Sequence, residues 1–185
     1  LARAMLRDGA TDNPQALLLA AQSLYRAGQQ DEALAAYEAA AQRAGTANDK
    51  GTYFDSHYAV GALLLELKRF AQSAERLRAL ASALPQHERA SQAHLLAIQA
   101  AAQEARRHDP PRLDGYKQLL HEHVTSWPES ATAAQAWWWL GRLEEHQGAW
   151  QEAIRAYKGI KPESDHFADA VAAVGRCYES ALADL

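Results

Sequence analysis

Apolar and small residues recur in this chain at spacings that place them on one face of a helix, and fixed offsets link each helix to the next. Trp137 and Gly141 stand one helical turn apart on a common face. Gly148 ends this helix, and a second helix follows in which Ala153 and Tyr157 lie twelve and sixteen residues after Gly141. The pattern predicts two helices packed against each other in antiparallel fashion.

The same two offsets occur in two other parts of the chain. They relate Ala21 to Ala33 and Tyr37, and Gly61 to Ser73 and Leu77. A small residue in the first helix lets the second helix approach, and larger residues fill the space on either side. Because each pair covers only one of its faces well, we expect the pairs to stack as an array of repeats.

The composition favours helices throughout the chain. It contains 42 Ala and 23 Leu, against 4 Val and 3 Ile. Ala and Leu are strong helix formers, whereas β-branched residues are the usual material of strands, so we predict an all-α protein with about nine helices and no sheet.

Helix-breaking residues divide the predicted array into units. Asn13 and Pro14 have the residue types of a helix cap and first turn, which makes residues 1–12 the tail of a preceding helix. The expected units then span residues 14–50, 54–87, 88–128 and 131–165, with a partial unit at 166–185. The third unit has a long helix over 88–107, a break at 108–111 and a partner over 112–126. A start on a helix tail, at Leu1 rather than at a methionine, predicts a fragment of a longer protein.

The fourth unit resembles the tetratricopeptide repeat, a family of helix pairs with Trp, Leu, Gly and Tyr on the first helix and Ala and an aromatic residue on the second. The matching residues are Trp137, Leu140, Gly141, Gly148, Trp150, Ala153 and Tyr157. Glu144 stands where the family usually has Tyr. The first unit keeps Gly28, Ala33, Leu34 and Tyr37, and the second keeps Gly61, Phe70 and Pro85. The resemblance implies a right-handed superhelix, and the length of the units is similar to that in envelope-associated bacterial members.

This resemblance also implies where a ligand would bind, because the first helices of the family line a concave groove that receives a peptide or a partner domain. The chain has the following residues at those positions: Leu18, Gln22, Tyr25, Tyr58, Leu65, Trp138, Arg142 and Arg176, with Asp169 beside them. Some members clamp a C-terminal carboxylate with Lys, Arg and Asn. Here those places hold Leu18, Gln22, Tyr58, Ala59 and Ala62, so we do not expect that clamp.

Three consecutive tryptophans, Trp137, Trp138 and Trp139, cannot all face one core, because successive helical residues project about 100° apart. Trp137 takes the position inside the repeat. Trp138 has two interpretations. In one, it lies in the groove with Arg142 one turn later and anchors a peptide, as Trp and Arg do at many interfaces. In the other, Trp138 and Trp139 pack against the long third unit.

The sequence offers no set of residues for catalysis or metal binding. It lacks a Gly-rich phosphate loop and a nucleophile elbow. His121 and His123 are two residues apart and diverge by about 200° on a helix, so they cannot hold one ion together. We therefore expect no enzyme activity, metal or cofactor.

The remaining polar residues have structural interpretations. We expect His57 to be a core histidine beside a polar neighbour, and Cys177 to be a buried, unreactive thiol. We interpret two acidic pairs as solvated helix faces or as acids in the first turn of a helix: Asp31-Glu32 and Glu144-Glu145.

The net charge of the chain bears on which classes of partner it could bind. The formal net charge is −4, the pI is near 6.1 and no basic block is present, which argues against nucleic acid. No apolar run approaches the roughly 20 residues of a membrane span. The leading hypothesis is a non-catalytic scaffold that binds a protein or peptide, in the cytoplasm or periplasm. A spacer or self-association module, and the helical accessory region of an envelope enzyme, stay open, as does the oligomeric state.

Overall fold

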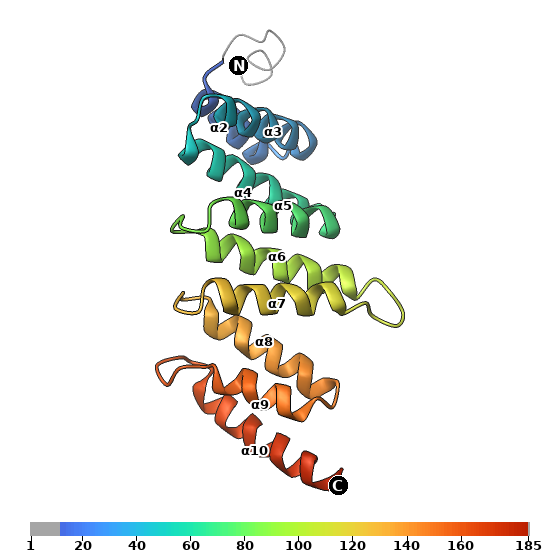
Figure 1. Cartoon of the computed structure of the whole chain (residues 1–185). Helices are drawn as coiled ribbons and strands as arrows, with labels where there is room; N and C mark the ends of the chain where they lie inside the picture. The colour runs from blue at the N-terminus through green and yellow to red at the C-terminus, as the bar shows by residue number, and fades with distance from the viewer. Residues whose placement is uncertain (1–11, 185) are drawn as a thin grey trace. The chain divides into compact units, whose positions relative to one another are not determined.

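The computed structural model describes residues 12–184, and within them the chain is helical with no strand. The nine helices of this part are α2 (Pro14–Arg26), α3 (Gln30–Thr46), α4 (Lys50–Glu66), α5 (Phe70–Ala83), α6 (Ala90–Ala105), α7 (Asp114–Ser126), α8 (Ala133–His146), α9 (Trp150–Lys158) and α10 (Phe167–Ala183) (Figure 1). The all-α prediction is confirmed. The expected tail of a preceding helix, over 1–12, falls almost wholly outside the described residues.

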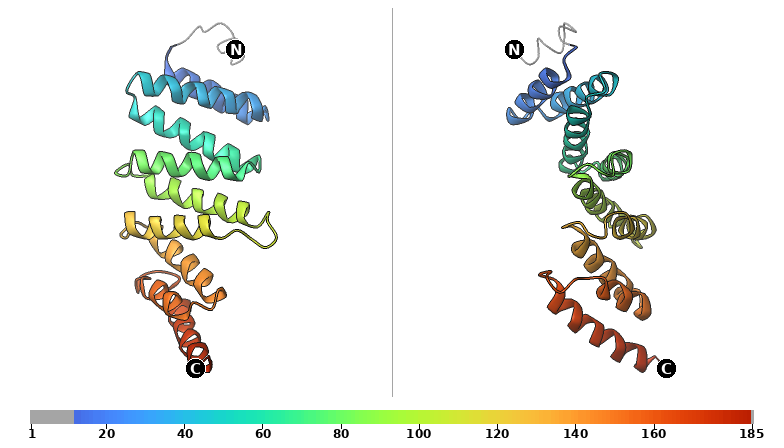
Figure 2. Two further views of the ribbon diagram at one scale, coloured as in Figure 1. Left: turned by 45° about the vertical axis from the view of Figure 1, so that its right-hand side comes forward. Right: turned by 60° about the vertical axis from the view of Figure 1, so that its left-hand side comes forward.

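The chain divides into two compact units, residues 1–104 and 105–185. In the first unit, α2, α3, α4 and α5 each pack on the next, and α2 also contacts α4. In the second, α7, α8, α9 and α10 pack in sequence. Figure 2 shows this stepwise order of neighbouring helices within each unit. Packing between sequence neighbours is what a repeat array requires.

Local sequence sets the helix ends. The Asn13 side chain accepts hydrogen bonds from the backbone N–H groups of Gln15 and Ala16, and Pro14 occupies the first turn, as predicted. Gly28 and Gly148 lie in the turns after α2 and α8 with φ of 74° and 71°. This left-handed conformation is easiest for glycine, which explains both breaks.

Register within the pairs follows the predicted offsets. A Cβ built on Gly61 would lie 2.4 Å from the side chain of Leu77, and one on Gly141 would lie 2.4 Å from the ring of Tyr157. Both contacts span sixteen residues. The twelve-residue offset brings the Ser73 hydroxyl to the Gly61 carbonyl, to which it donates a hydrogen bond of 2.7 Å. Only glycine leaves room for these side chains against the helix backbone.

Tyr157 makes the closest approach to the glycine of the fourth pair. The three atoms nearest to a Cβ built on Gly141 all belong to the Tyr157 ring. Ala153 is fully buried in the same pair. The large side chain, rather than the small one, therefore fills the space over the glycine.

The expectation that Glu144 and Glu145 form a solvated face is wrong. Glu144 is 1% exposed and lies 2.8 Å, through Oε2, from the Lys117 ammonium of α7. The Glu145 side chain is 21% exposed and accepts a hydrogen bond of 2.6 Å from the Tyr157 hydroxyl. Both acids lie within about one turn of Gly141, on a helix that packs against α7 and α9. Their place on this helix therefore determines how buried they are, more than the polarity of their side chains does.

Other expectations about single residues are confirmed. Cys177 is fully buried, and burial raises the pKa of its thiol. For His57 only the polar neighbour, Arg76, is confirmed, because the imidazole is half-buried and does not belong to the buried core. His121 is exposed while His123 is fully buried, so the two rings diverge as predicted. Asp31, in the first turn of α3, is exposed.

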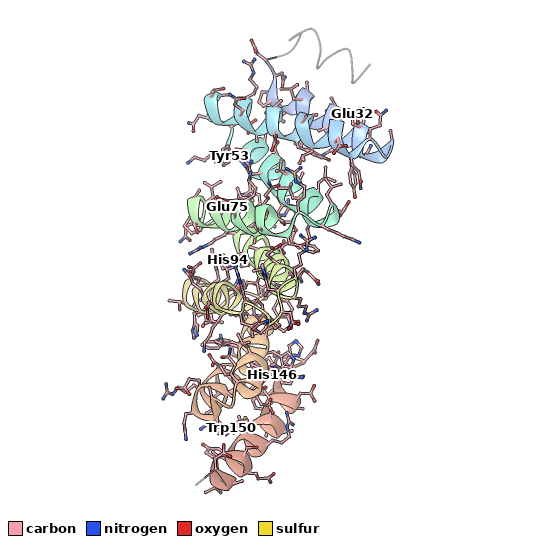
Figure 3. The ribbon with its side chains drawn as sticks, turned by 90° about the vertical axis from the view of Figure 1, so that its right-hand side faces the viewer. Glu32, Tyr53, Glu75, His94, His146 and Trp150 are labelled. Atoms are coloured by element: carbon pink, nitrogen blue, oxygen red, sulfur yellow. The ribbon has the colours of Figure 1, made fainter. Side chains whose placement is uncertain are left out.

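A tertiary contact also joins the start of α9 to the end of α10 in the second unit. The Trp150 indole at the start of α9, labelled in Figure 3, donates a hydrogen bond of 2.7 Å to the Asp184 carboxylate just after α10. Among the helices of residues 12–184, none combines the length and apolar character needed to cross a membrane.

Candidate functional site

An aromatic and charged surface lies on α8 and α10 of the second unit. We call it the α8–α10 patch and define it by Trp138, Arg142, Glu145, His166 and Arg176. The first three stand four and three residues apart on α8, so they share one face of the helix. His166 occupies the N-cap position of α10, and Arg176 lies nearly three turns further along the same helix.

Trp138 forms the aromatic part of the patch. Its ring stacks parallel to the His166 imidazole, with centroids 5.5 Å apart and planes 4° apart. It also tilts against the ring of Tyr157 at 5.4 Å. The His166 Nε2 in turn donates a hydrogen bond of 3.1 Å to the Gln135 side-chain oxygen. These contacts hold the half-buried indole in one orientation and leave part of it accessible.

Two arginines give the patch its positive charge. The Arg142 guanidinium is exposed and its Cζ lies 5.8 Å from the centre of the Trp138 ring, within cation–π range. The Arg176 side chain is 54% exposed, and its Nε donates a hydrogen bond of 3.4 Å to Glu145. Glu145 therefore partly neutralises Arg176, whereas Arg142 faces the ring.

Tyr157 links the patch to the core beneath it. Its ring fills the space over Gly141, and its hydroxyl donates to Glu145. Burial of the phenol, and then the hydrogen bond to Glu145, raise the pKa of Tyr157. The hydroxyl stays protonated at neutral pH and fixes the Glu145 carboxylate.

The structure brings together three of the predicted site residues, Trp138, Arg142 and Arg176. The ring partners of Trp138 are Tyr157 and His166, from the following helices rather than from the preceding third unit. Sequence reasoning missed the roles of Glu145 and His166. The i, i+4, i+7 spacing from Trp138 would have identified Glu145, but nothing in the sequence signals that His166 stacks on the indole.

The other predicted residues lie in the first unit, on α2 and α4. The Tyr25 hydroxyl donates to both oxygens of Glu66, at 2.8 and 2.9 Å, and this bond is the main cause of the raised pKa of Tyr25. The Tyr58 ring lies 4.4 Å from the Arg89 guanidinium. The remaining three, Leu18, Gln22 and Leu65, are half-buried.

Three of the first-unit residues, Leu18, Tyr25 and Tyr58, thus already have partners. Leu18 packs against the core that Leu24 and Leu64 help to form. Arg89, which covers Tyr58, is itself held by Asp55 at 2.9 Å. A ligand on this face would have to compete with these contacts, whereas Arg142 in the second unit is open to one. The described residues contain no group of three or more His, Cys, Asp or Glu side chains placed to hold a metal.

Comparisons with known proteins agree with the predicted repeat. A tetratricopeptide repeat model matches residues 15–45, which cover α2 and most of α3. The chain has the fold of the solved structure titled crystal structure of MamA protein, with a TM-score of 0.60 at 16% identity over 90% of this chain and 81% of that one. It is also similar to MamA from residue 41 to its end, from Desulfovibrio magneticus RS-1, with a TM-score of 0.55, 17% identity and coverages of 90% and 78%.

A MamA RS-1 ArsTM double mutant matches with a TM-score of 0.54 and 19% identity, over 80% of this chain and 74% of that one. At these identities the likeness concerns the fold, which is the tetratricopeptide-like arrangement of helix pairs. No curated protein matches the chain in sequence.

Proposed function

We propose that this chain, which contains a tetratricopeptide repeat at residues 15–45, is a non-catalytic scaffold that binds a peptide segment of a partner protein on the α8–α10 patch. The observation that carries the proposal is the pairing of an oriented indole, Trp138, with an exposed guanidinium, Arg142, one turn away. Trp and Arg dominate the energetics of protein interfaces, and a side chain that is already held in place loses little entropy on binding.

The chemistry of the patch specifies the kind of ligand. An apolar or aromatic side chain of the ligand would cover the accessible part of Trp138. A carboxylate two or three residues away would meet Arg142, whose planar guanidinium binds carboxylates with two parallel hydrogen bonds. Arg176 would add a second cation if the ligand loosened its contact with Glu145. The favoured ligand is a segment with an apolar anchor and an acidic flank.

A structural role is the competing function, and Trp138 itself favours it. The ring contacts with Tyr157 and His166 are those of a side chain that helps to join α8 to α9 and α10. In that case the patch would stabilise a spacer. The two functions differ in what Trp138→Ala changes.

The proposal can be tested in two steps. A phage-displayed library of 12-residue linear peptides is selected on the intact protein, and the affinity of the enriched peptides is then measured by fluorescence anisotropy. We expect Trp138→Ala and Arg142→Gln each to weaken binding about tenfold or more, since hot-spot truncations typically cost about 2 kcal/mol. Trp138→Phe, which keeps an aromatic ring, should retain most of the affinity. Arg155→Gln is the matched control, because Arg155 is exposed on α9 and pairs with Glu152.

Melting temperatures measured on the same variants separate the two functions. A half-buried tryptophan contributes to stability, so Trp138→Ala should lower the melting temperature while Arg142→Gln leaves it nearly unchanged. A large loss of stability in Trp138→Ala, with unchanged affinity in the protein that remains folded and in Arg142→Gln, would reject peptide binding at the patch and leave a spacer.

A further inference from the structure

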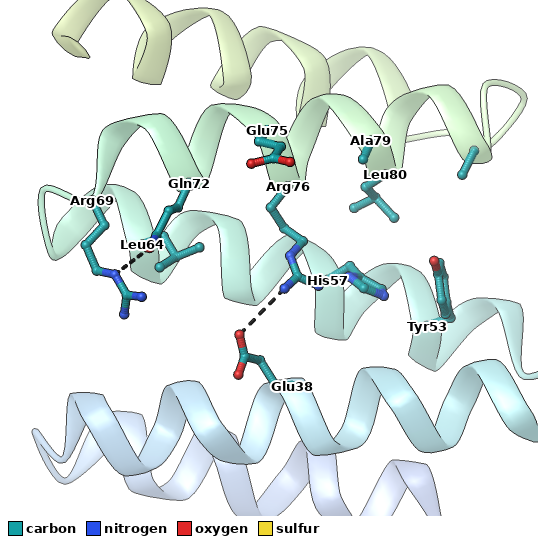
Figure 4. A pocket seen from close by; sticks show the side chains of 11 residues that line it. Glu38, Tyr53, His57, Leu64, Arg69, Gln72, Glu75, Arg76, Ala79 and Leu80 are labelled. Carbon is teal, nitrogen blue, oxygen red and sulfur yellow. Dashed lines mark hydrogen bonds and ion pairs between the residues drawn. The ribbon is translucent and has the colours of Figure 1, made fainter.

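A groove runs along the first unit between α3 and α5, and α4 forms its floor (Figure 4). Its volume is about 570 Å³. The lining residues are Glu38 on α3, Tyr53, His57 and Leu64 on α4, and Arg69, Gln72, Glu75, Arg76, Ala79, Leu80 and Ala83 on α5. We call this cavity the α3–α5 groove. Tyr58 and Leu65, the predicted ligand contacts of α4, point about a third of a turn away from this stripe.

Arg76 reaches from α5 across the middle of the groove, as Figure 4 shows. Its Nη1 lies 3.1 Å from His57 Nδ1. Because arginine only donates, the imidazole must accept through Nδ1 and carry its proton on Nε2. Burial, and then the nearby Arg76, lower the pKa of His57 to about 4, so this partner is uncharged at neutral pH.

The only carboxylate paired with Arg76 across the groove in the described residues is that of Glu38, and the pair is loose. Arg76 Nη2 and Glu38 Oε1 are 3.6 Å apart, and the Glu38 side chain is 50% exposed. An exposed pair at this distance contributes little. Arg76 is therefore held in position by a neutral imidazole and by a loose ion pair with Glu38. A second carboxylate, that of the exposed Glu75, also lines the groove.

Accessible apolar surface lies on one side of Arg76, where the half-buried Tyr53 and the exposed Ala79 and Ala83 line the groove. On the other side the groove is lined by the exposed Arg69 and Gln72, beside the buried Leu64 (Figure 4). Beyond Tyr53 a second hollow of about 240 Å³ adjoins the groove, since both are lined by Tyr53 and Ala83. Ala44 and Leu84 are among its other lining residues. The groove thus offers the Arg76 guanidinium and, toward Tyr53 and the second hollow, apolar surface.

We propose that the α3–α5 groove is a second peptide-binding site, which receives an acidic side chain at Arg76 and an apolar side chain beside Tyr53. The occupant is a segment of a partner protein in which an Asp or Glu stands next to apolar residues on one side. Its carboxylate displaces Glu38 and bonds the guanidinium, which fits carboxylates in planar, two-bond geometry. A basic side chain would instead be placed beside Arg76 and is disfavoured. This site is independent of the α8–α10 patch, since it uses residues of the first unit alone.

The test selects the phage-displayed library of 12-residue peptides on the Trp138→Ala protein, in which the α8–α10 patch is disabled. The enriched peptides, labelled with fluorescein, are then titrated with the unmodified protein and with groove variants. We expect peptides with an acidic residue that has apolar residues on one side. Arg76→Gln and Ala79→Trp should each reduce affinity at least tenfold, and Glu38→Gln, which removes the competing carboxylate, should raise it severalfold.

Two features keep this test decisive. Ala79 is exposed on the groove wall, so a tryptophan there fills the groove without entering the core, even if Arg76→Gln destabilises the unit. Ala131→Trp, at an exposed position before α8, is the matched control and should leave affinity unchanged.

The proposal is overturned if no peptide is enriched, or if Ala79→Trp binds the enriched peptides as the unmodified protein does. It is also overturned if sedimentation velocity shows a concentration-dependent dimer that Ala79→Trp abolishes, because the groove would then bind a second copy. Loss of affinity in Arg142→Gln with none in Ala79→Trp would show that the enriched peptides still bind the α8–α10 patch and would reject the groove. The failure of one site can thus be distinguished from the failure of the other.

Discussion

Leu64 in the first unit and Glu144 in the second occupy the same place in their repeats, three residues after Gly61 and Gly141 respectively. Leu64 is 4% exposed and belongs to an apolar core with Leu24, while Glu144 is 1% exposed and pairs with Lys117. The position is buried whether its side chain is an alkyl group or a carboxylate. The position of a residue relative to the packed glycine therefore determines whether its side chain is buried. The polarity of the side chain determines only whether it needs a charged partner there.

The largest expected effect on stability comes from removing Lys117, the ion-pair partner of Glu144. Lys117→Met should lower the free energy of unfolding by about 3 kcal/mol, because it leaves a buried carboxylate without its cation. We place the loss at the lower end of the range for buried pairs because the Lys117 side chain is 34% exposed, which admits water. Urea denaturation followed by circular dichroism measures it. A change below about 0.5 kcal/mol would contradict the burial of Glu144.

A second variant makes the two units alike at this position. Lys117→Met combined with Glu144→Leu, which copies Leu64, should return stability to within about 1 kcal/mol of the unmodified protein. Replacing a buried ion pair with apolar side chains is often neutral. If the double variant were as unstable as Lys117→Met alone, the loss would come from the absence of the lysine stem rather than from an unpaired charge.

The glycines themselves give the next effect in size. Gly141→Leu should cost about 1 to 3 kcal/mol through overpacking against Tyr157, despite a better helix propensity. Gly175 stands 34 residues later in the same register, and nothing lies within 4 Å of a Cβ built on it. Gly175→Ala should therefore stabilise the protein by up to about 1 kcal/mol. In thermal melting, Gly141→Leu should lower the melting temperature and Gly175→Ala should raise it. A change in the same direction for both variants would contradict the register.

The smallest effect concerns His57, beside Arg76 in the first unit. Its pKa is near 4 in the folded protein and 6.5 without the fold, so the unfolded chain binds more protons between these values. Its contribution is complete above pH 6.5 and declines as the pH falls toward 4. His57→Asn, whose amide replaces Nδ1, should lose less stability than the unmodified protein between pH 7 and pH 5. Equal losses in urea denaturation would show that His57 titrates normally.

The sequence could predict those parts of the fold that depend on local chemistry and spacing. Asn13 and Gly28 indicate helix ends by their residue types alone. The sixteen-residue offset from Gly61 to Leu77 predicts that the Leu77 side chain packs on the backbone at Gly61. These features need no knowledge of distant contacts. The assignment of repeat-unit boundaries along the whole chain stays a prediction.

The surface chemistry could be predicted only in part. Trp138 and Arg142 lie on one helix, so their spacing already places them side by side. The stacking of His166 and the burial of Glu144 depend on which helix packs beside α8, and polarity alone pointed to a solvated Glu144. The α3–α5 groove was missed because it arises between three helices, from side chains that are individually unremarkable.

The claim most central to this account is that Trp138 contacts a bound peptide, and one NMR titration tests it directly. In ¹⁵N-labelled protein, the indole N–H signal of Trp138, assigned from Trp138→Phe, is followed as an enriched peptide with an apolar anchor and an acidic flank is added. We predict that this signal shifts while that of Trp150, which is hydrogen-bonded to Asp184, stays in place. A bound peptide that leaves the Trp138 signal unmoved would contradict the account.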